Sequence, residues 1–305
     1  MASIRFLVLG AAAGGGLPQW NCGCVNCRAA RDPAAPLMPQ TQSSLAASVD
    51  GENWVLFNAS PDLRTQIEHN RMLHPKDLRD SPIRSVVLTN GDVDHIAGLL
   101  TLREKQEFSL FATPGLQALL AAHPVFGVLD PALVAKIEVD LETDITPLAG
   151  LTVRLFAVPG KVPLYQETSE LSLDQETDQT VGVELCAGGR RAYYIPGCGR
   201  MTEALARRID GADIVFFDGT LFTDDEMIRA GTGLKTGRRM GHMPITGDGG
   251  SLEALGRLAI GRRLYIHINN TNPIWRAGPE RAAVEAAGFT ICHDGLEVIL
   301  DAQFQ

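Results

Sequence analysis

Short apolar segments alternate regularly with segments of helical pattern along this chain. Strands are predicted where β-branched and aromatic residues gather, at 4–9, 43–49, 54–58, 83–88 and 108–112, then at 153–158, 181–186, 192–195, 214–218 and 264–268. Helices are predicted at 63–70, 95–105, 114–122, 202–209 and 251–258. Two strand-rich halves with interspersed helices predict an α/β fold of two packed sheets covered by helices.

The remaining segments are interpreted from turn signals and charge. Residues 289–293 and 296–300 are predicted to form a closing hairpin around Asp294-Gly295. Residues 163–180 carry acidic side chains and no basic one, which predicts a solvated, mobile loop. Residues 219–250 have little periodicity, and long loops of this kind often carry function.

Charge and hydropathy exclude several classes of protein. The 305 residues include 36 Asp and Glu against 27 Lys and Arg, so the net charge is −9. This acidic balance argues against nucleic-acid phosphate as a partner. No apolar run reaches the roughly 18–20 residues that cross a bilayer, so we expect no membrane span. The apolar start of the chain is short for a signal peptide and is better interpreted as a buried strand, which predicts a cytoplasmic protein.

A glycine-rich turn follows the first predicted strand. Gly10 and Gly15 have the spacing of a phosphate-binding loop. However, Gly16 and Leu17 stand where that loop requires Lys and then Ser or Thr. The dinucleotide fingerprint fails too, because Gln19 occupies a position that needs glycine. We therefore interpret the turn as a tight strand exit that lets the backbone approach a neighbouring site.

Three of the six cysteines lie close together, at Cys22, Cys24 and Cys27. In a cytoplasmic protein such a cluster indicates metal binding or catalysis, and three thiolates at this spacing suit one structural zinc ion. A closed zinc site needs a fourth ligand from a distant segment, for which Asn270 and His293 are the candidates. Redox chemistry and three unrelated thiols are the alternatives. We expect the other three cysteines to be structural.

Polar residues also follow two of the predicted strands, at the sheet edge where α/β proteins bind ligands. Asp92, Asp94 and His95 come after one apolar strand, and together they suit a divalent metal ion. His267 comes near the end of another apolar strand. The alternative is structural, with Asp92 as a turn residue and Asp94 as a helix N-cap.

Several motifs match one known family. Residues 90–95 read Asn-Gly-Asp-Val-Asp-His and resemble the His-x-His-x-Asp-His turn of the metallo-β-lactamase superfamily, with the first two His replaced. The Cys-x-Cys-x-x-Cys insert, the phrase Asn-Ala-Ser-Pro-Asp-Leu-Arg at 58–64 and Gly-His-Met-Pro at 241–244 resemble one family within it. That family is the pyrroloquinoline quinone (PQQ) biosynthesis protein B family, and the resemblance covers nearly the whole chain.

The resemblance implies a four-layer αββα sandwich that forms a single domain over residues 1–305, with a zinc-binding insert at 21–27. It also implies a structural zinc ion on Cys22, Cys24 and Cys27, and a homodimer supported by the zinc loop. In related phosphodiesterases of the superfamily a His stands where this chain has Asn270. The identity of the fourth zinc ligand therefore stays open.

The chain departs from the hydrolases of the superfamily at four ligand positions. Two are the replaced His residues of the turn. In the hydrolases a further His and a bridging Asp follow strands that here end near Pro159-Gly160 and Pro196-Gly197, and both positions hold glycine. A site that makes hydroxide on two zinc ions would therefore lack four of its usual ligands.

The ligands that remain suit iron. They are His95, His267 and one or both of Asp92 and Asp94. Two imidazoles and a carboxylate with open coordination positions are the ligand set of non-haem iron(II) oxygenases. The family resemblance implies the matching reaction, an Fe2+- and O2-dependent hydroxylation of a tyrosine-derived ring in the cross-linked Glu-Tyr precursor of PQQ.

The precursor is anionic, and the long 219–250 loop offers cations. Arg238, Arg239 and His242 are predicted to bind its carboxylates, because a guanidinium fork suits carboxylate geometry. A solvated basic loop is the alternative for the two Arg residues. Other proteins of the PQQ pathway are further expected partners. Two other functions stay open: a non-catalytic carrier that transports PQQ or its precursor, and a residual metallohydrolase, against which the two glycines argue.

Overall fold

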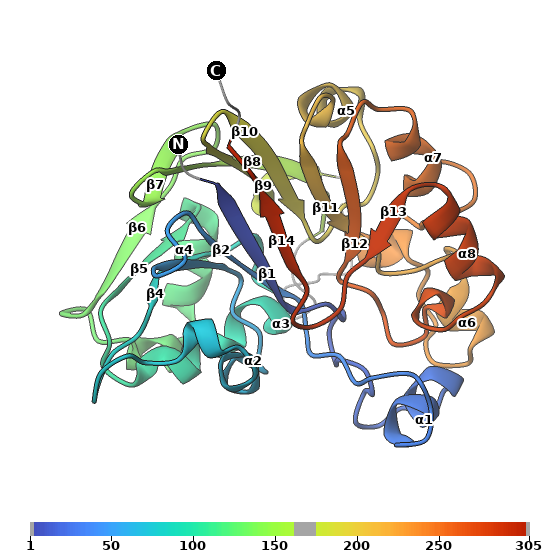
Figure 1. The fold of residues 1–305 in the computed structure, drawn as a ribbon, viewed down its shortest axis with the longest axis horizontal. Coiled ribbons are helices and arrows are strands. Elements are labelled where there is room, and N and C mark those ends of the chain that lie inside the picture. Colours follow the sequence, from blue (N-terminus) through green and yellow to red (C-terminus); the bar gives the residue numbers. More distant parts are fainter. Residues whose placement is uncertain (1–2, 162–174, 303–305) are drawn as a thin grey trace.

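Two seven-stranded sheets form the centre of this computed structural model, which describes residues 3–161 and 175–302 (Figure 1). Sheet one has the order β14 (Glu297–Leu300), β1 (Ile4–Gly10), β2 (Ser44–Ser48), β3 (Trp54–Phe57), β4 (Ile83–Val87), β5 (Phe108–Ala112) and β6 (Val134–Glu138). Sheet two has the order β13 (Phe289–Ile291), β12 (Arg262–Ile266), β11 (Ile214–Asp218), β10 (Arg190–Ile195), β9 (Gln175–Ala187), β8 (Leu151–Gly160) and β7 (Asp144–Leu148).

The strands of sheet one place alternate side chains on opposite faces, as the period of two requires. In β1, Phe6 and Val8 belong to the core between the sheets, whereas Leu7 and Leu9 belong to the core on the outer face. The two sheets contact each other directly, because the Phe6 ring lies 5.2 Å from the Phe216 ring of β11. Both faces of sheet one are therefore buried.

Helices cover the two outer faces (Figure 1). Sheet one carries α2 (Leu63–His69), η1 (Arg71–Leu73), α3 (Val93–Ile96), η2 (Ala97–Arg103), α4 (Pro114–Ala122) and η3 (Pro124–Val128). The later helices are α5 (Glu203–Ile209), α6 (Glu226–Arg229), η5 (Arg238–Met240), α7 (Ser251–Gly256), η6 (Pro273–Trp275) and α8 (Pro279–Ala286). The short α1 (Val25–Arg31) of the cysteine insert projects from the sandwich (Figure 1). The predicted αββα sandwich is confirmed.

The predicted closing hairpin is wrong. β13 pairs with β12 in sheet two, and β14 pairs with β1 in sheet one. The intervening Asp294 joins the two sheets, since its carboxylate accepts hydrogen bonds from Ala11 N (2.9 Å) and Thr41 N (2.7 Å). The Asp-Gly pair is therefore part of a crossover whose partners come from distant segments.

Other predicted boundaries also change. The helix predicted at 95–105 is a short α3 followed by the 3-10 helix η2, and β6, β7, α1 and α8 were not predicted. The acidic segment at 163–180 was predicted to be a loop. Its residues 175–180 instead form the start of β9, and its residues 163–174 lie outside the described residues. None of the helices in the described part of the chain has both the length and the hydropathy needed to cross a membrane.

The polar residues that follow the strands of both sheets meet at one edge of the sandwich. Here the glycine turn after β1 pairs with the segment after β12, through Ala13 N to Ile268 O and Ile268 N to Ala11 O, both 2.9 Å. β3 and β4 are parallel in sheet one, and β11 and β12 are parallel in sheet two. Their carboxyl ends therefore deliver side chains to the same place.

Candidate metal centre

The predicted ligands Asp94, His95 and His267 lie together at this edge. Their ligand atoms lie within 4.8 Å of one another, and all three residues are largely shielded from solvent. The Asp94 Oδ2 atom is 3.1 Å from His267 Nε2 and 3.7 Å from His95 Nε2. Asp94 and His95 come from α3 after sheet one, whereas His267 follows β12 of sheet two. The group thus joins the two halves of the chain.

The environment of His95 fixes the nitrogen that is available to a metal. Asn90 Oδ1 accepts a hydrogen bond from Asp92 N at 3.0 Å, so it also accepts from His95 Nδ1, 2.7 Å away. The lone pair is therefore on His95 Nε2, which is buried and has no hydrogen-bond partner among the described residues. Burial lowers the pKa of this imidazole, which favours its neutral form. A neutral, buried nitrogen of this kind fits a metal ligand.

His267 is held in the same way from the other sheet. Its Nδ1 lies 2.8 Å from Thr220 Oγ1, whose hydroxyl is 2.6 Å from Asp218 Oδ1. Because the hydroxyl donates to that carboxylate, it accepts from His267 Nδ1 and leaves Nε2 directed at Asp94. His267 has a φ of 59°, in the left-handed region that non-glycine residues rarely adopt. Strain of this kind occurs at functional sites, where the surrounding structure enforces it.

Asp94 supplies the negative charge of the group. Burial opposes its ionisation, but His95 and the hydrogen bond from His267 hold the pKa of its carboxyl well below its usual range. The Asp94 charge and hydrogen bond in turn raise the pKa of His267, against the effect of burial. The glycine turn runs beside this carboxylate, as expected, because a Cβ on Gly14 would lie 3.4 Å from Asp94 Oδ2. Two imidazoles and one carboxylate therefore fit a divalent cation.

Asp92 lies at the edge of this group. It occupies the N-cap position of α3, and its backbone carbonyl accepts from His95 N at 2.9 Å. Its side chain makes no capping hydrogen bond, and among the described residues it is not in the compact group of ligand atoms. Asp92 as a metal ligand stays a prediction. Asp94, for which N-capping was the alternative, lies within α3.

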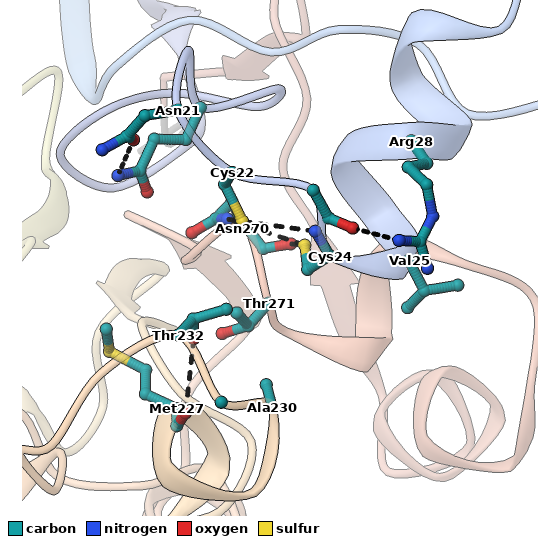
Figure 2. A pocket seen from close by; sticks show the side chains of 13 residues that line it. Asn21, Cys22, Cys24, Val25, Arg28, Met227, Ala230, Thr232, Asn270 and Thr271 are labelled. Carbon is teal, nitrogen blue, oxygen red and sulfur yellow. Dashed lines mark hydrogen bonds between the residues drawn. The ribbon is translucent and has the colours of Figure 1, made fainter.

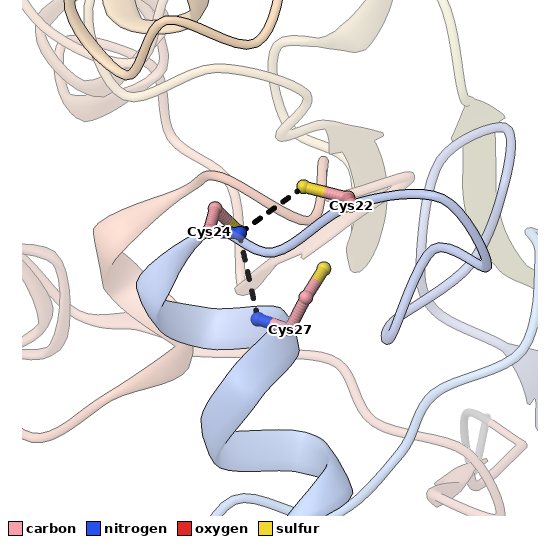
Figure 3. Close-up of side chains that lie close together, drawn as sticks. All are labelled: Cys22, Cys24 and Cys27. Carbon is pink, nitrogen blue, oxygen red and sulfur yellow. Dashed lines mark hydrogen bonds between the residues drawn. The ribbon is translucent and has the colours of Figure 1, made fainter.

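The three clustered cysteines converge as predicted (Figure 3). Cys24 Sγ accepts from Cys27 N at 3.5 Å and Cys22 Sγ from Cys24 N at 3.4 Å. Burial and the neighbouring thiols raise the pKa of Cys24 to about 11, whereas the bond from Cys24 N lowers the pKa of Cys22 against burial. Adjacent thiols that resist joint deprotonation fit a divalent cation, which would stabilise several thiolates at once.

Asn270 is the distant residue that reaches this cluster. Its Nδ2 lies 3.2 Å from Cys22 Sγ (Figure 2) and 3.2 Å from Cys27 Sγ. His293, the other candidate, is exposed, contacts the Asp294 carbonyl through Nδ1 and, among the described residues, is not in the compact group with the cysteines, so its role as the fourth ligand stays a prediction. The crossover that replaces the predicted hairpin sets its position. An open pocket of about 600 Å³ lies beside the cluster, between the cysteine loop and residues 227–232 (Figure 2).

Comparison with known proteins gives the family. A family model described as a β-lactamase superfamily domain matches residues 53–268. Coenzyme PQQ synthesis protein B of Rhizobium meliloti (strain 1021) is 64% identical over 299 residues, covering 98% of this chain and 99% of that protein. The protein of the same name from Methylobacterium sp. (strain 4-46) is 55% identical and covers 97% and 100%. This chain belongs to the coenzyme PQQ synthesis protein B family.

Solved structures agree with the fold of this PQQ synthesis protein B family member. The crystal structure of Zn2+-bound PqqB from Methylobacterium extorquens matches with a TM-score of 0.95 and 53% identity, covering 96% of this chain and 99% of that one. A diphosphatase of the PhnP family matches with a TM-score of 0.71 at 20% identity, covering 99% of both chains. The second likeness shows the fold alone.

The two glycines that set this PQQ synthesis protein B chain apart from hydrolases are enclosed by neighbours. A Cβ on Gly160 would lie 2.6 Å from the Thr180 side chain, and one on Gly197 would lie 3.6 Å from His242 Cε1. The Thr180 side chain therefore occupies the space that a metal-binding side chain at residue 160, as in the hydrolases, would need. A side chain at 197 would extend into space beside the His242 ring.

Asp218 and Thr220 also belong to the site and were not predicted from the sequence. Asp218, at the end of β11, is fully buried and forms a second compact group with His242 and His267. Its Oδ2 lies 2.7 Å from His242 Nδ1, and the His242 and His267 rings stack with centroids 5.2 Å apart. Despite burial, His242 holds the pKa of the Asp218 carboxyl below its usual range. The sequence pattern could have identified Asp218, because it is the last residue of the strand predicted at 214–218. His267 has a similar position, next to the end of the strand predicted at 264–268.

The three predicted substrate-binding residues occupy different settings. His242 lies beside the metal group, with Nδ1 engaged by Asp218. Arg238 donates to the Asp248 carbonyl at 2.6 Å, so its guanidinium is directed at the turn around residue 248. Arg239 donates through its backbone to Thr236 Oγ1. Binding of substrate carboxylates by these residues stays a prediction.

Proposed function

We propose that this protein is an iron(II)- and O2-dependent hydroxylase of PQQ synthesis. Membership of the coenzyme PQQ synthesis protein B family assigns it to that pathway. The proposed substrate is the tyrosine-derived ring in the cross-linked Glu-Tyr precursor. The observation that supports the reaction is the buried His95 Nε2, without a hydrogen-bond partner among the described residues, beside Asp94 and His267: a set of two imidazoles and a carboxylate.

The chemistry that iron would supply there is activation of O2, with one oxygen atom inserted into the ring and the other reduced to water by a two-electron reductant. Asp94, His95 and His267 hold the metal, with Asp92 as a further ligand at the edge. Asn90 and Thr220 hold the two imidazoles with Nε2 facing inward. The backbone of the glycine turn lies beside this group at Gly14, where an added Cβ would be 3.4 Å from Asp94 Oδ2.

His242 serves the substrate in this proposal. Asp218 Oδ2 accepts a hydrogen bond from His242 Nδ1, so His242 Nε2 presents its lone pair for a phenolic hydrogen of the substrate. Arg238 and Arg239 supply positive charge near a multiply anionic precursor. In this proposal the substrate is bound and oriented by His242, Arg238 and Arg239. The reaction itself takes place at the metal ligands Asp94, His95 and His267.

The decisive experiment measures O2 uptake by anaerobically iron-loaded protein given a dihydroxyphenylalanine-like substrate and a two-electron reductant, with mass spectrometry for a product that has gained one oxygen atom. We expect turnover, and we expect His267→Ala to lose both iron retention and turnover. His293→Ala is the matched control, since it removes an exposed imidazole outside the metal group, and should behave as the native protein.

No O2 uptake at full iron occupancy would contradict the hydroxylase and favour the carrier of PQQ or its precursor. Turnover of chromogenic esters with zinc or manganese would instead support a metallohydrolase. The packing of Thr180 against Gly160 opposes that outcome, because a ligand at residue 160 has no space.

A structural zinc ion on Cys22, Cys24 and Cys27, closed by Asn270, is the second part of the proposal. The relative from Methylobacterium extorquens is described as Zn2+-bound, which supports a zinc site in this family. Replacing zinc by Co2+ tests it, because thiolate ligands give cobalt an intense charge-transfer band. Cys27→Ala should weaken that band, and Cys292→Ala, at an equally buried thiol elsewhere, should leave it intact.

The zinc loop is also proposed as the homodimer contact. It exposes two large apolar side chains, Trp20 at 86% and Val25 at 50%. Sedimentation should give a dimer for the native protein and a shift to monomer for Trp20→Ser. The Leu78→Ser variant is changed at a fully exposed position outside the zinc loop and should stay dimeric. A native monomer would contradict this contact.

A further inference from the structure

One short stretch of chain connects the two groups of metal-ligating residues. Residues 267–272, here called the linking segment, begin at His267 in the His/Asp group. Three residues later Asn270 lies among the cysteines, with Nδ2 3.2 Å from Cys22 Sγ and Cys27 Sγ. A ligand of one site and a contact of the other are therefore separated by only two residues.

The first half of the linking segment is anchored to the sandwich. Ile268 N donates to Ala11 O, and Asn269 N donates to Thr220 O, both at 2.9 Å. These bonds hold the backbone directly after His267, which has the strained φ of 59°. The conformation that directs His267 at Asp94 thus depends on contacts around the segment, because the residue alone does not favour it.

The second half is anchored to the cysteine insert by Asn26. This side chain is fully buried, and its Nδ2 donates to the carbonyls of Asn270 and Asn272, both at 2.8 Å. Arg276 Nε donates to Asn26 Oδ1 at 2.6 Å and so fixes the orientation of the amide. Asn26 lies between Cys24 and Cys27 in sequence, so any movement of the cysteine loop moves this anchor.

We propose that the two sites bind their metals with positive cooperativity, coupled through Asn26 and the linking segment. The inference rests on the two metal sites of the proposed function. A cation that joins the thiolates fixes the cysteine loop, and with it Asn26 and Asn270. The linking segment is then ordered before the second metal arrives, so His267 loses less conformational freedom on binding. By reciprocity, metal at the His/Asp group strengthens zinc binding at the cysteines.

The experiment uses Mn2+ as the probe of the His/Asp group, because Mn2+ prefers oxygen and imidazole ligands over thiolates. Loss of the free Mn2+ signal in electron paramagnetic resonance gives the dissociation constant. It is measured on the full chain with zinc at the cysteines, and after a chelator has removed the zinc and been removed by desalting. We expect about tenfold weaker Mn2+ binding without zinc, within the roughly 5- to 150-fold range of coupled sites.

Two variants separate coupling from general loss of structure. Asn26→Asp keeps the shape and the Arg276 contact but places an acceptor against the two carbonyls. It should weaken Mn2+ binding several-fold even when zinc is bound. Cys292→Ala removes a buried thiol outside the cluster and should change neither affinity. Near-UV circular dichroism of each sample shows that the sandwich is retained.

The outcomes distinguish this inference from the proposed function. Mn2+ affinity that is the same with and without zinc, and in Asn26→Asp, overturns the coupling and leaves both sites standing. Mn2+ binding that survives His267→Ala overturns the site assignment itself, and the coupling with it. Weaker binding on zinc removal and in Asn26→Asp, but not in Cys292→Ala, supports the coupling.

Discussion

At the scale of single residues, Asn90 and Thr220 decide which nitrogen of each imidazole faces inward. Asn90 Oδ1 accepts a hydrogen bond from His95 Nδ1, and Thr220 Oγ1 accepts one from His267 Nδ1. Such partners orient a ligand and raise its basicity, so their loss weakens metal binding although they do not touch the metal. Neither residue type signals this role in a sequence.

Thr220→Val tests this positioning. Valine keeps the shape but removes the hydroxyl that lies between Asp218 and His267, so the buried Asp218 carboxylate loses a donor. We expect a loss of about 1–3 kcal/mol in the free energy of unfolding, measured with urea. Metal affinity at the His/Asp group should fall by about 10- to 100-fold, measured by calorimetry.

Thr220→Ser is the matched control, because it keeps the hydroxyl and removes only a methyl group. It should retain most of the metal affinity. If serine and valine weaken binding equally, packing of the methyl group and not the hydrogen bond positions His267.

The predictable part of the site follows one rule, that polar residues after an apolar strand lie at a ligand-binding edge. The rule identified Asp94, His95 and His267. The rule did not identify Asp218, because a single carboxylate at the end of a strand has no second metal-ligating residue beside it in the sequence. Its partner, His242, comes 24 residues later from an aperiodic loop, and only the packed fold brings the two together.

At the scale of elements, the α3–η2 unit that carries Asp94 and His95 docks by its backbone. Ala59 N donates to His95 O at 2.7 Å, and Gly98 N donates to Ala59 O at 2.8 Å. This contact leaves no space for a side chain at residue 98, because a Cβ there would lie 2.2 Å from Ser60 O.

Gly98→Ala should therefore destabilise the protein and displace His95. Overpacking typically costs about 1–3 kcal/mol, and the obstacle here is rigid backbone. Thermal unfolding and Mn2+ affinity should both decrease. Gly256→Ala in α7 is the control, since outside its own helix turn no atom of the described residues lies within 4 Å of its added Cβ, and its thermal midpoint should be unchanged or slightly higher. Equal effects of the two substitutions would contradict the close docking.

Glu226, the first residue of α6, makes stability depend on pH. Burial raises its pKa from 4.5 to about 7, although Thr271 Oγ1 donates to its carboxylate. The folded protein keeps this proton where the unfolded chain has released it. The contribution to the free energy of unfolding is thus full below about pH 4.5 and is lost as the pH rises through 7, by roughly 3 kcal/mol.

Glu226→Gln should flatten this decline in urea denaturation curves between pH 4.5 and 8. The exposed Glu203→Gln should reproduce the native pH dependence, since its side chain is 92% exposed. If Glu226→Gln declines as steeply as the native protein, the buried carboxyl is not the group responsible.

Elements were predictable where local composition determines them. Most strands of the sandwich core were predicted, because β-branched and aromatic residues favour buried strands whatever the topology. β6 was missed because its pattern is polar, with Ala135, Lys136 and Glu138 exposed at the sheet edge. The helix predicted at 95–105 became α3 and η2, because backbone docking at Gly98 shapes it more than propensity does.

At the scale of the whole molecule, one core joins the sheets. The Phe57 ring of β3 lies 6.2 Å from the Tyr194 ring of β10, and the buried cluster between the sheets runs through both. The topology was not predictable in full. The last two strands share a short connection in the sequence, yet they enter different sheets because Asp294 bonds to backbone from the first 41 residues.

We expect the two sheets to unfold together. Trp54 lies in sheet one and Trp275 in η6, beside the linking segment. In Trp20→Phe/Trp275→Phe, fluorescence reports sheet one, and in Trp20→Phe/Trp54→Phe it reports the other half. In each variant the fluorescence and far-UV circular dichroism transitions in urea should coincide. Separate transitions would show that the halves fold independently and that the shared core contributes little cooperativity.

The pairing of β14 with β1 has a consequence for biosynthesis. β1 (Ile4–Gly10) leaves the ribosome long before β14 (Glu297–Leu300), its partner on one side. At about 5–20 residues per second, the interval is on the order of 15–60 s. Through that time one edge of β1 offers unpaired backbone groups to other nascent chains. Chaperone capture during translation should therefore favour this N-terminal strand until residue 300 has emerged.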